Sequence, residues 1–280
     1  DKGEERRIPV SLRTRGHFRL QRRTCSFVNL QVIFPDSGTK GTPFQGQKAL
    51  KLGAHCQSDS RYESNLMKEY LAYRIFNVVS DKSFRARLSA ATYVDSASGK
   101  TVDKRLAMWI ENENDVAARN GARIREARGA LFDDVDQPTL DMLTLFEYSI
   151  GNTDFSVYAL HNTRLAQAQD GAMYILGYDF DFSGLVGAPY ASPDPQLPIK
   201  NVRQRLYRGA CRKVDEFAPT VARFNDKKDA ILALFNEVPD LRGADLKDAR
   251  GYMDEFFATI SKPKSVKGDI LDTCINKPGI

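Results

Sequence analysis

Two aspartates that stand one residue apart are the side chains of this sequence best suited to chemistry. Asp179 and Asp181 lie in the segment GYDFDFSG, directly after the apolar run MYILGY. Carboxylates are hard oxygen ligands of the kind that Mg²⁺ and Mn²⁺ take in proteins. An aspartate pair at the end of a strand can therefore hold a divalent metal.

The residues after Ser183 argue against two of the sites that use such a pair. A haloacid-dehalogenase-like phosphatase presents Asp-x-Asp-x-Ser/Thr after a strand, but it requires a parallel α/β domain downstream. Residues 185–200 are instead rich in proline, and helical spacing follows from Val202. A glycosyltransferase DxD site is also less favoured, because the tripeptide alone is common by chance.

The upstream segment GNTDFSVYALHN supplies better partners for the pair. Asp154 follows a helix stop, Asn162 comes eight residues later, and Asp179 comes 25 residues after Asp154. Kinase-like phosphoryl transfer uses this set in this order: an Asp that orients or deprotonates the acceptor hydroxyl, an Asn that helps to hold metal, and a later metal-binding Asp. The spacing thus predicts a site for a nucleotide and a divalent metal.

The rest of the chain must fold so that these groups meet. It has 280 residues, of which 42% are hydrophobic and 28% charged, which suits one large domain or two joined lobes. No run approaches the ~18 apolar residues of a membrane helix, so we expect no membrane span. Strand patterns cover residues 8–56, a hairpin over 87–112 and the run 173–178. Helical patterns cover 58–79, about 113–128, the segment after Pro138 and 202–260, and 262–280 reads as a loose tail.

This order of elements predicts an α+β fold of two lobes. Residues 1–115 form a small, mixed, β-rich lobe on the nucleotide-phosphate side. Residues 116–280 form a mainly helical lobe that carries the catalytic loop, the DxD pair and the tail.

Positive charge gathers in RTRGHFRLQRR (13–23) and in residues 201–213, within a net charge of +5. Such clusters suit ligands that bear phosphate. Solvated faces of strands and helices are the alternative reading. Nucleic acid is not expected as a partner, because no recognition motif accompanies the charge.

Four cysteines allow two disulfides without any metal-binding spacing. Cys25 and Cys56 lie near the ends of predicted strands in one lobe, and Cys211 with Cys274 would tie the tail to the helical lobe. Free thiols in a cytosolic protein and disulfides in an exported one both fit, and an exported location is the preferred expectation. The start at Asp1 fits either a trimmed chain or a mature exported form.

These motifs together resemble the spore-coat protein H (CotH) kinase family. GNTDFS, HN and YDFDFSG are similar to its N-x-D, H-N and W/Y-D-x-D order, and RTRGHFRLQRRTCSFVNLQVIF resembles its opening R-x-R-G-N-S-S-R…K-K stretch. LKL with ESNLMKEYLAYRIF is similar to its strand and helix, and AMWIENENDVAARNG to a later acidic segment. The resemblance covers about residues 8–187 and points to a bacterial branch of the family.

The resemblance implies an atypical protein-kinase-like fold that transfers the γ-phosphate of ATP to a hydroxyl, a Ser or Thr of a protein acceptor, with Mg²⁺ or Mn²⁺. It makes Asp154 the catalytic aspartate, and Asn162 and Asp179 the metal ligands. Asp181 would be a second acidic ligand or a structural partner.

The resemblance also implies a nucleotide-binding set in the first lobe. Lys51 is the first choice for the phosphate-binding lysine and Lys48 the second, and Glu69 is preferred to Glu63 as its helix partner. The phosphate-covering turn would consist of a glycine and two flanking arginines: Gly16, Arg15 and Arg19.

Some residues depart from the family pattern. His17-Phe18 replace Asn-Ser after the glycine, and Arg22-Arg23 replace the two lysines, although arginine can bind phosphate with two donors. There is no H-R-D and no G-x-G-x-x-G, which excludes a standard protein kinase. A pseudokinase or surface-binding module without turnover, and nucleotidyl transfer on the same fold, stay open.

Two further residue sets have simpler readings. The spacing of His17, His55 and His161 does not indicate zinc, and His161 is better placed to orient the catalytic loop. Phe180 and Phe182 read as anchors that hold the DxD segment in the core.

Overall fold

The computed structural model describes residues 5–16, 18–21 and 23–275, so His17 and Arg22 lie outside the described residues. The chain is a mixed α+β protein and forms two compact units. The first unit is Asp1–Glu63 with Ala86–Asn112, and the second is Ser64–Arg85 with Glu113–Ile280. The expected division was 1–115 and 116–280. Residues 64–85, which include most of the helix α1 (Ser60–Val79), group with the second unit.

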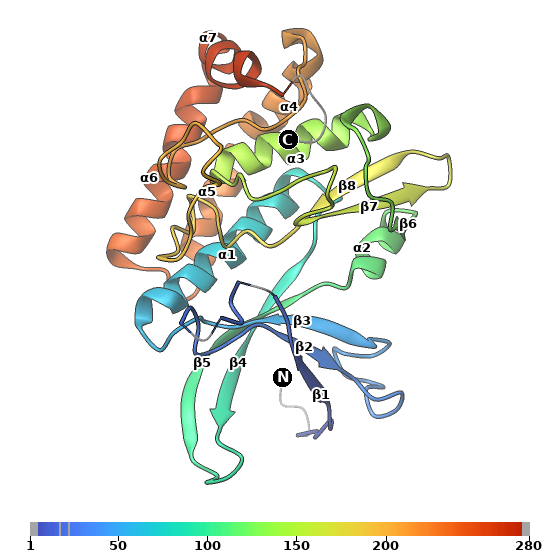
Figure 1. The fold of residues 1–280 in the computed structure, drawn as a ribbon, viewed down its shortest axis with the longest axis vertical. Helices are drawn as coiled ribbons and strands as arrows, with labels where there is room; N and C mark the ends of the chain where they lie inside the picture. The colour runs from blue at the N-terminus through green and yellow to red at the C-terminus, as the bar shows by residue number, and fades with distance from the viewer. Residues whose placement is uncertain (1–4, 17, 22, 276–280) are drawn as a thin grey trace. The chain divides into compact units, whose positions relative to one another are not determined.

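The first unit contains an antiparallel five-stranded sheet in the order β1-β2-β3-β5-β4 (Figure 1). Asp95 shapes the turn of the predicted hairpin, because its side chain accepts the N–H groups of Ala97 and Ser98. Lys51 lies on the central strand, opposite Gln31 and Ile110. The strands are β1 (Ser11–Thr14), β2 (Leu30–Ile33), β3 (Ala49–Gly53), β4 (Ala86–Val94) and β5 (Thr101–Ile110).

The interior of the first unit holds a disulfide and the buried side chain of His55. Cys25 and Cys56 form the disulfide, as expected from the sequence. The ring of His55 lies 4.3 Å from that of Phe27 and 5.5 Å from that of Tyr93, and burial lowers its pKa. His55 is thus part of the packing of this unit.

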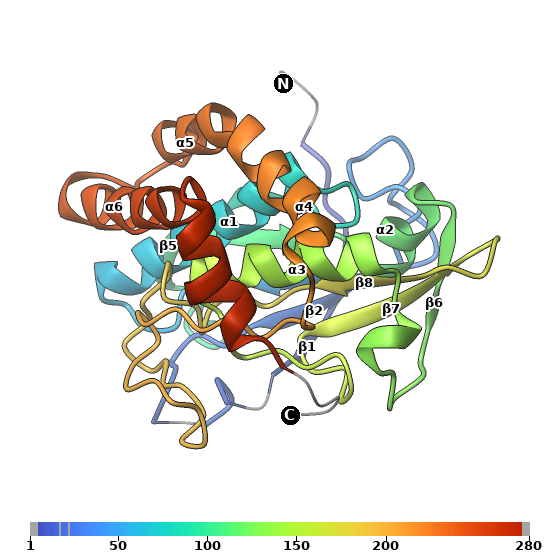
Figure 2. The same ribbon diagram turned by 90° about the horizontal axis from the view of Figure 1, so that it is seen from above.

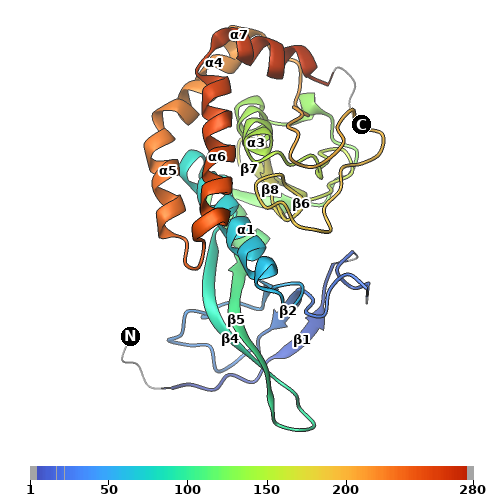
Figure 3. The ribbon, with the colours of Figure 1, turned by 90° about the vertical axis from the view of Figure 1, so that its left-hand side faces the viewer.

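The second unit is mainly helical. In α3 the side chain of Asp136 accepts the N–H of Thr139, which caps the helix, and Gly151 ends it with a φ of 66°. Figure 3 shows α1 next to the start of α6, where Ser64 and Lys68 both bind the carboxylate of Asp245. The longer helices are α1 (Ser60–Val79), α3 (Gln137–Ile150), α4 (Val214–Asp226), α5 (Lys228–Glu237) and α6 (Gly243–Ile260).

A three-stranded antiparallel sheet, β6-β7-β8, completes the second unit, and α3 lies beside β8 (Figure 2). Its strands are β6 (Ala122–Arg125), β7 (Thr163–Ala168) and β8 (Met173–Gly177). Aromatic rings fill the core: Phe76 stacks on Phe146 at 4.2 Å, and Phe146 lies 5.1 Å from Phe180. Phe180 therefore anchors the DxD segment in the core, as expected.

Several segments differ from the sequence-based expectation. Residues 202–213 were expected to be helical, but the helices of this region begin only with α4 (Val214–Asp226). The helix expected over 113–128 ends early as α2 (Glu113–Arg119), because Gly121 turns the chain with a φ of 65° and β6 follows. The strand β7 has no strong sequence signal and was not expected. Its pairing with both β6 and β8 stabilises it.

The described part of the tail is ordered rather than loose. It forms short helical turns with Val266 and Ile270 buried, and the predicted disulfide joins Cys274 to Cys211. The turns are α7 (Pro263–Ser265), η2 (Val266–Ile270) and η3 (Leu271–Thr273), and η1 (Phe132–Asp134) precedes α3. Residues 276–280 lie outside the described residues. Within the part of the chain that the structure describes, no helix is long and apolar enough to span a bilayer.

Candidate active site

The loop that carries Asp154 is built directly on the end of α3. Its first polar residue, Asn152, bonds in two directions: its carbonyl oxygen accepts the N–H of Asp154 at 3.1 Å, and its amide donates to Oε2 of Glu147 at 2.9 Å. An Asn that bonds the backbone two residues on forms an Asx-turn. The position of Asp154 is thus tied to a side chain inside α3.

The carboxylate of Asp154 is held from both sides. The Nε2 atom of His161 lies 3.0 Å from its Oδ1, and Nδ2 of Asn162 donates to its Oδ2 at 3.0 Å and to its backbone oxygen at 2.8 Å. The hydrogen bond with Asp154 raises the pKa of His161, the charges of Asp154 and Asp179 raise it further, and burial opposes them. His161 therefore orients Asp154 in this structure.

Asp179 stands at the end of β8 in an unusual backbone conformation. Its φ is 67°, a left-handed value that costs a non-glycine residue about 1 kcal/mol or more. The hydroxyl of Tyr73, which is fully buried, accepts the N–H of Asp179 at 2.9 Å. The half-buried carboxylate of Asp179 has no hydrogen-bond or ion-pair partner among the described residues.

Left-handed backbone is concentrated at this site. Leu160 and Asn162 have φ values of 51°, and of the described non-glycine residues only Asp240 joins them and Asp179 at positive φ. Strained backbone persists only where the surroundings hold it, and it clusters at functional sites. Because Nδ2 of Asn162 donates to Asp154, its Oδ1 is the amide atom available to a cation.

Asp181 is more enclosed than Asp179. Its side chain is 6% exposed, and its Oδ2 accepts the hydroxyl hydrogen of Tyr190 at 2.9 Å. Its role as a second metal ligand stays a prediction, and the bond to Tyr190 supports the structural role.

Two glycines bring the end of GYDFDFSG against the start of the loop that carries Asp154. The N–H of Gly184 donates to the backbone oxygen of Gly151 at 3.1 Å. A Cβ at Gly184 would lie 2.4 Å from both the hydroxyl of Tyr252 and the backbone oxygen of Val202. No side chain fits there, so glycine is required for the two segments to meet.

Glu147 is a buried carboxyl group that the sequence did not point to. It is 1% exposed, and its Oε1 has no hydrogen-bond partner among the residues the structure describes. A Cβ at Gly177 would lie 3.1 Å from that oxygen, so the strand before Asp179 also packs on Glu147. Burial raises the pKa of Glu147 to about 8, the hydrogen bond from Asn152 opposes this, and the charge of Asp154 adds to it.

The basic segment 201–213 braces the site. Arg203 pairs with Asp248 and also donates to the backbone oxygen of Gly184. Arg205 donates to the backbone oxygen of Ser149 at 3.3 Å. These two arginines thus form bonds within the protein, and the reading of the cluster as a phosphate site or a solvated face stays a prediction.

A hollow of about 220 Å³ opens beside Asp154. Arg208 lies at its wall and donates to the backbone oxygen of Thr153 at 2.6 Å, and burial lowers its pKa. The hollow is the size of a small side chain or ligand and has the catalytic-loop carboxylate in its wall. Its polar lining comes from Asp154, Ser156, His161, Ser192, Asp194 and Arg208.

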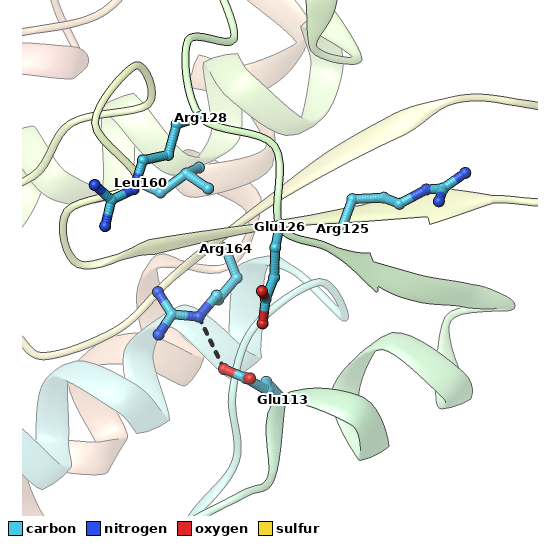
Figure 4. A pocket seen from close by; sticks show the side chains of 6 residues that line it. All are labelled: Glu113, Arg125, Glu126, Arg128, Leu160 and Arg164. Carbon is cyan, nitrogen blue, oxygen red and sulfur yellow. Dashed lines mark hydrogen bonds and ion pairs between the residues drawn. The ribbon is translucent and has the colours of Figure 1, made fainter.

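A larger hollow of about 580 Å³ adjoins the same loop at Leu160 (Figure 4). Its lining is almost wholly charged. The other lining residues are Glu113, Arg125, Glu126, Arg128 and Arg164. In Figure 4 the guanidinium groups of Arg128 and Arg164 point to the same side, whereas Arg125 extends the opposite way.

The expected nucleotide residues near the N-terminus all belong to the first unit. Gly16 adopts a φ of 88°, so the predicted turn requires glycine. Arg15 is half-buried, and its N–H donates to the backbone oxygen of Asn29. Arg19 is buried and donates to the side chain of Asn29 and the backbone oxygen of Ala54, so it also stabilises this unit.

The lysine and glutamate candidates differ in burial. Lys51 is half-buried on the central strand, whereas Lys48 is exposed. Buried lysines are rare without a specific role, which favours Lys51. Glu69 is 4% exposed on α1 in the second unit, whereas Glu63 accepts the N–H of Leu106 in the first. The pairing of Lys51 with Glu69 stays a prediction.

The residues that sequence reasoning missed act through others: Glu147, Tyr73 and Tyr252. Tyr73 bonds the N–H of Asp179 and Glu147 bonds Asn152, but no spacing rule connects these residues to Asp154 or Asp179 in the sequence. In the described part of the chain, no three or more His, Cys, Asp and Glu side chains cluster as a ready metal site. The predicted set is of another kind, with an amide oxygen beside carboxylates. Comparison of the chain with protein-family models and with curated proteins gives no match.

Proposed function

We propose that this protein is an atypical kinase with a kinase-like two-lobed fold, which transfers the γ-phosphoryl group of ATP to a hydroxyl of a protein Ser or Thr. One observation carries the proposal. Asp154 is oriented by His161 and Asn162, in the same unit as a strained, half-buried Asp179 whose carboxylate has no partner among the described residues. Phosphoryl transfer needs an orienting carboxylate and metal-binding oxygens in this order.

The donor set fits a divalent cation. The carboxylate of Asp179 and Oδ1 of Asn162 are the atoms that would hold it, with Asp181 as a further candidate. When bound, Mg²⁺ or Mn²⁺ would neutralise charge on the nucleotide phosphates. The phosphate-binding roles of Lys51, Glu69 and Gly16 stay predictions from the sequence.

The reaction balances on the residues named. The acceptor hydroxyl gives its proton to the carboxylate of Asp154 as its oxygen bonds to the γ-phosphorus. The bond from that phosphorus to the bridging oxygen breaks, and ADP leaves with the electron pair. His161 and Asn162 keep Asp154 in place during the transfer, so the contribution of these residues is positioning.

The two disulfides support an exported location for this activity. Disulfides form and persist in oxidising compartments, and both bonds join segments far apart in sequence. The acceptor would then be an extracellular or periplasmic protein.

The test is incubation with γ-labelled ATP and Mn²⁺, with and without a mixture of Ser/Thr proteins. We expect label transfer by the wild type and a loss of about 10²-fold or more in Asp179→Ala and Asp154→Asn. Asp229→Ala, an exposed aspartate on α5, is the matched control and should behave as the wild type.

Equal labelling by wild type and Asp179→Ala would refute the proposal. A thermal shift with ATP and Mn²⁺ accompanies the assay: binding without transfer would identify a pseudokinase or binding module. Label from α-labelled ATP, with pyrophosphate release, would instead identify nucleotidyl transfer.

A further inference from the structure

The charged hollow at Leu160 has an excess of positive charge once its internal pairing is counted. Nε of Arg164 donates to Oε2 of Glu113 at 2.8 Å, so these two charges cancel. The remaining charged lining is Arg125, Arg128 and Glu126. The residues that line the hollow thus carry a net positive charge.

Among the residues that line this hollow, Arg128 has hydrogen-bond donors that are available to a ligand. It is exposed, and it forms no hydrogen bond or ion pair with any residue that the structure describes. Arg125 is engaged through Nε with Gln167 at 2.8 Å. A guanidinium group has five N–H donors in a planar fork that matches a carboxylate or a phosphoryl group.

The position of the hollow connects it to the proposed chemistry. Leu160 lines it, and the next residue, His161, bonds Asp154 and lines the smaller hollow. An extended peptide advances about 3.3 Å per residue. A peptide whose hydroxyl lies at Asp154 can therefore place a side chain in the larger hollow within a few residues.

We propose that this hollow is an acceptor subsite that binds an acidic side chain, a carboxylate or a phosphorylated residue, close in sequence to the accepting hydroxyl. The proposal rests on the kinase function proposed above. An anion meets the guanidinium of Arg128, which forms no hydrogen bond or ion pair with any described residue. A cationic side chain would be repelled by Arg128, whose guanidinium points to the same side as that of Arg164 in Figure 4.

The experiment uses four peptides that are identical except at the positions flanking one Ser/Thr acceptor: aspartate, alanine, lysine or phosphoserine. Transfer from γ-labelled ATP is measured as kcat/KM for wild type, Arg128→Ala, Arg128→Glu and the control Arg123→Ala. Arg123 is an exposed arginine of β6 outside the hollow. We expect the wild type and Arg123→Ala to prefer the aspartate peptide over the lysine peptide about tenfold. Arg128→Ala should lose most of that preference, and Arg128→Glu should reverse it.

Binding of the same peptides, labelled with a fluorophore and followed by anisotropy, separates this proposal from the proposed function. If no variant transfers phosphate but the wild type binds the aspartate peptide and Arg128→Glu does not, the kinase function fails and the subsite stands. Stronger selection of phosphoserine than of aspartate identifies a phosphorylated acceptor, and the reverse identifies a carboxylate.

Two results would overturn the subsite. One is an unchanged peptide preference in Arg128→Glu. The other is a weaker thermal shift with ATP and Mn²⁺ in Arg128→Glu without any change in peptide binding, because the hollow would then serve the nucleotide.

Discussion

Glu147 offers a quantitative test of the packing beneath the catalytic loop. It is 1% exposed, and Asn152 donates to one of its oxygens while the other has no partner among the described residues. Burial raises the pKa of Glu147 to about 8 from 4.5. The folded protein therefore keeps a proton on Glu147 at pH 7, whereas the unfolded chain has released it.

The difference between the folded and unfolded pKa of Glu147 makes the free energy of unfolding depend on pH. Because the folded pKa is the higher one, the stabilisation is fully present below pH 4.5 and is lost as the pH rises through about 8. The interval from 4.5 to 7 is about 2.5 pH units, which corresponds to about 3 kcal/mol of unfolding free energy. Near pH 8 the loss is about 4 kcal/mol.

The substitution Glu147→Gln removes the titration and keeps the shape. Its amide oxygen can still accept from Asn152, and it carries no charge at any of these pH values. We expect the free energies of unfolding of the variant and the wild type to be nearly equal at pH 4.5. At pH 7 the variant should be more stable by about 3 kcal/mol. The other titrating groups are common to both proteins and cancel in the difference.

The measurement is urea unfolding at pH 5, 6, 7 and 8, followed by far-UV circular dichroism, which reports mainly on the helical second unit. Trp109, the single tryptophan, lies in β5 of the first unit, so its fluorescence follows that unit separately. Glu126→Gln, at an exposed glutamate, is the control and should give a difference that does not vary with pH. A pH-independent difference for Glu147→Gln would show that Glu147 is not held protonated and would refute the reasoning.

Three further predictions concern the support of the site. Gly184→Ala should lower both the melting temperature and label transfer, since its Cβ would lie 2.4 Å from a backbone oxygen. Wild-type values of both would show that the contact of Gly184 with the loop after α3 is not needed for stability or transfer. Tyr73→Phe removes the acceptor of the Asp179 N–H and should cost about 1–3 kcal/mol in urea unfolding, with weaker Mn²⁺-ATP binding; unchanged binding would mean that the left-handed backbone is held by other contacts. Replacing Cys211 and Cys274 by alanine removes a disulfide that joins residues 63 positions apart, and it should lower the free energy of unfolding by about 4 kcal/mol. A decrease of less than about 1 kcal/mol would contradict this prediction.

Local residue chemistry accounts for the elements that the sequence predicted well. The strands of the hairpin β4–β5 alternate in burial over much of their length, and α3 has clear end signals, with Asp136 before it and Gly151 after it. Those signals act within a few residues, so they can be recognised without knowledge of the fold. The strand β7 and the short turns after Pro263 lack such signals, and they form because neighbouring strands and a disulfide hold them.

Some residues of the candidate site could be recognised from the sequence, whereas contacts between distant residues could not. Asp154, Asn162 and Asp179 could be selected because their types, order and spacing suit one chemistry. The ion pair of Arg203 with Asp248 could not be predicted in the same way, because charge in a sequence does not tell whether a partner lies within reach. The predicted break in the chain near residue 115 missed that residues 64–85 pack with the second unit.

The sequence alone therefore determined the α+β class, most of the main elements and the candidates Asp179 and Asp181 in GYDFDFSG, and the structure selected the cysteine pairing. The tertiary structure alone decided how these candidates are held. It placed His161 on Asp154, the hydroxyl of Tyr73 on the N–H of Asp179, and the carboxyl of Glu147 beneath both segments. These contacts join residues that are up to 106 positions apart, and only the packing of a completed core brings such residues together.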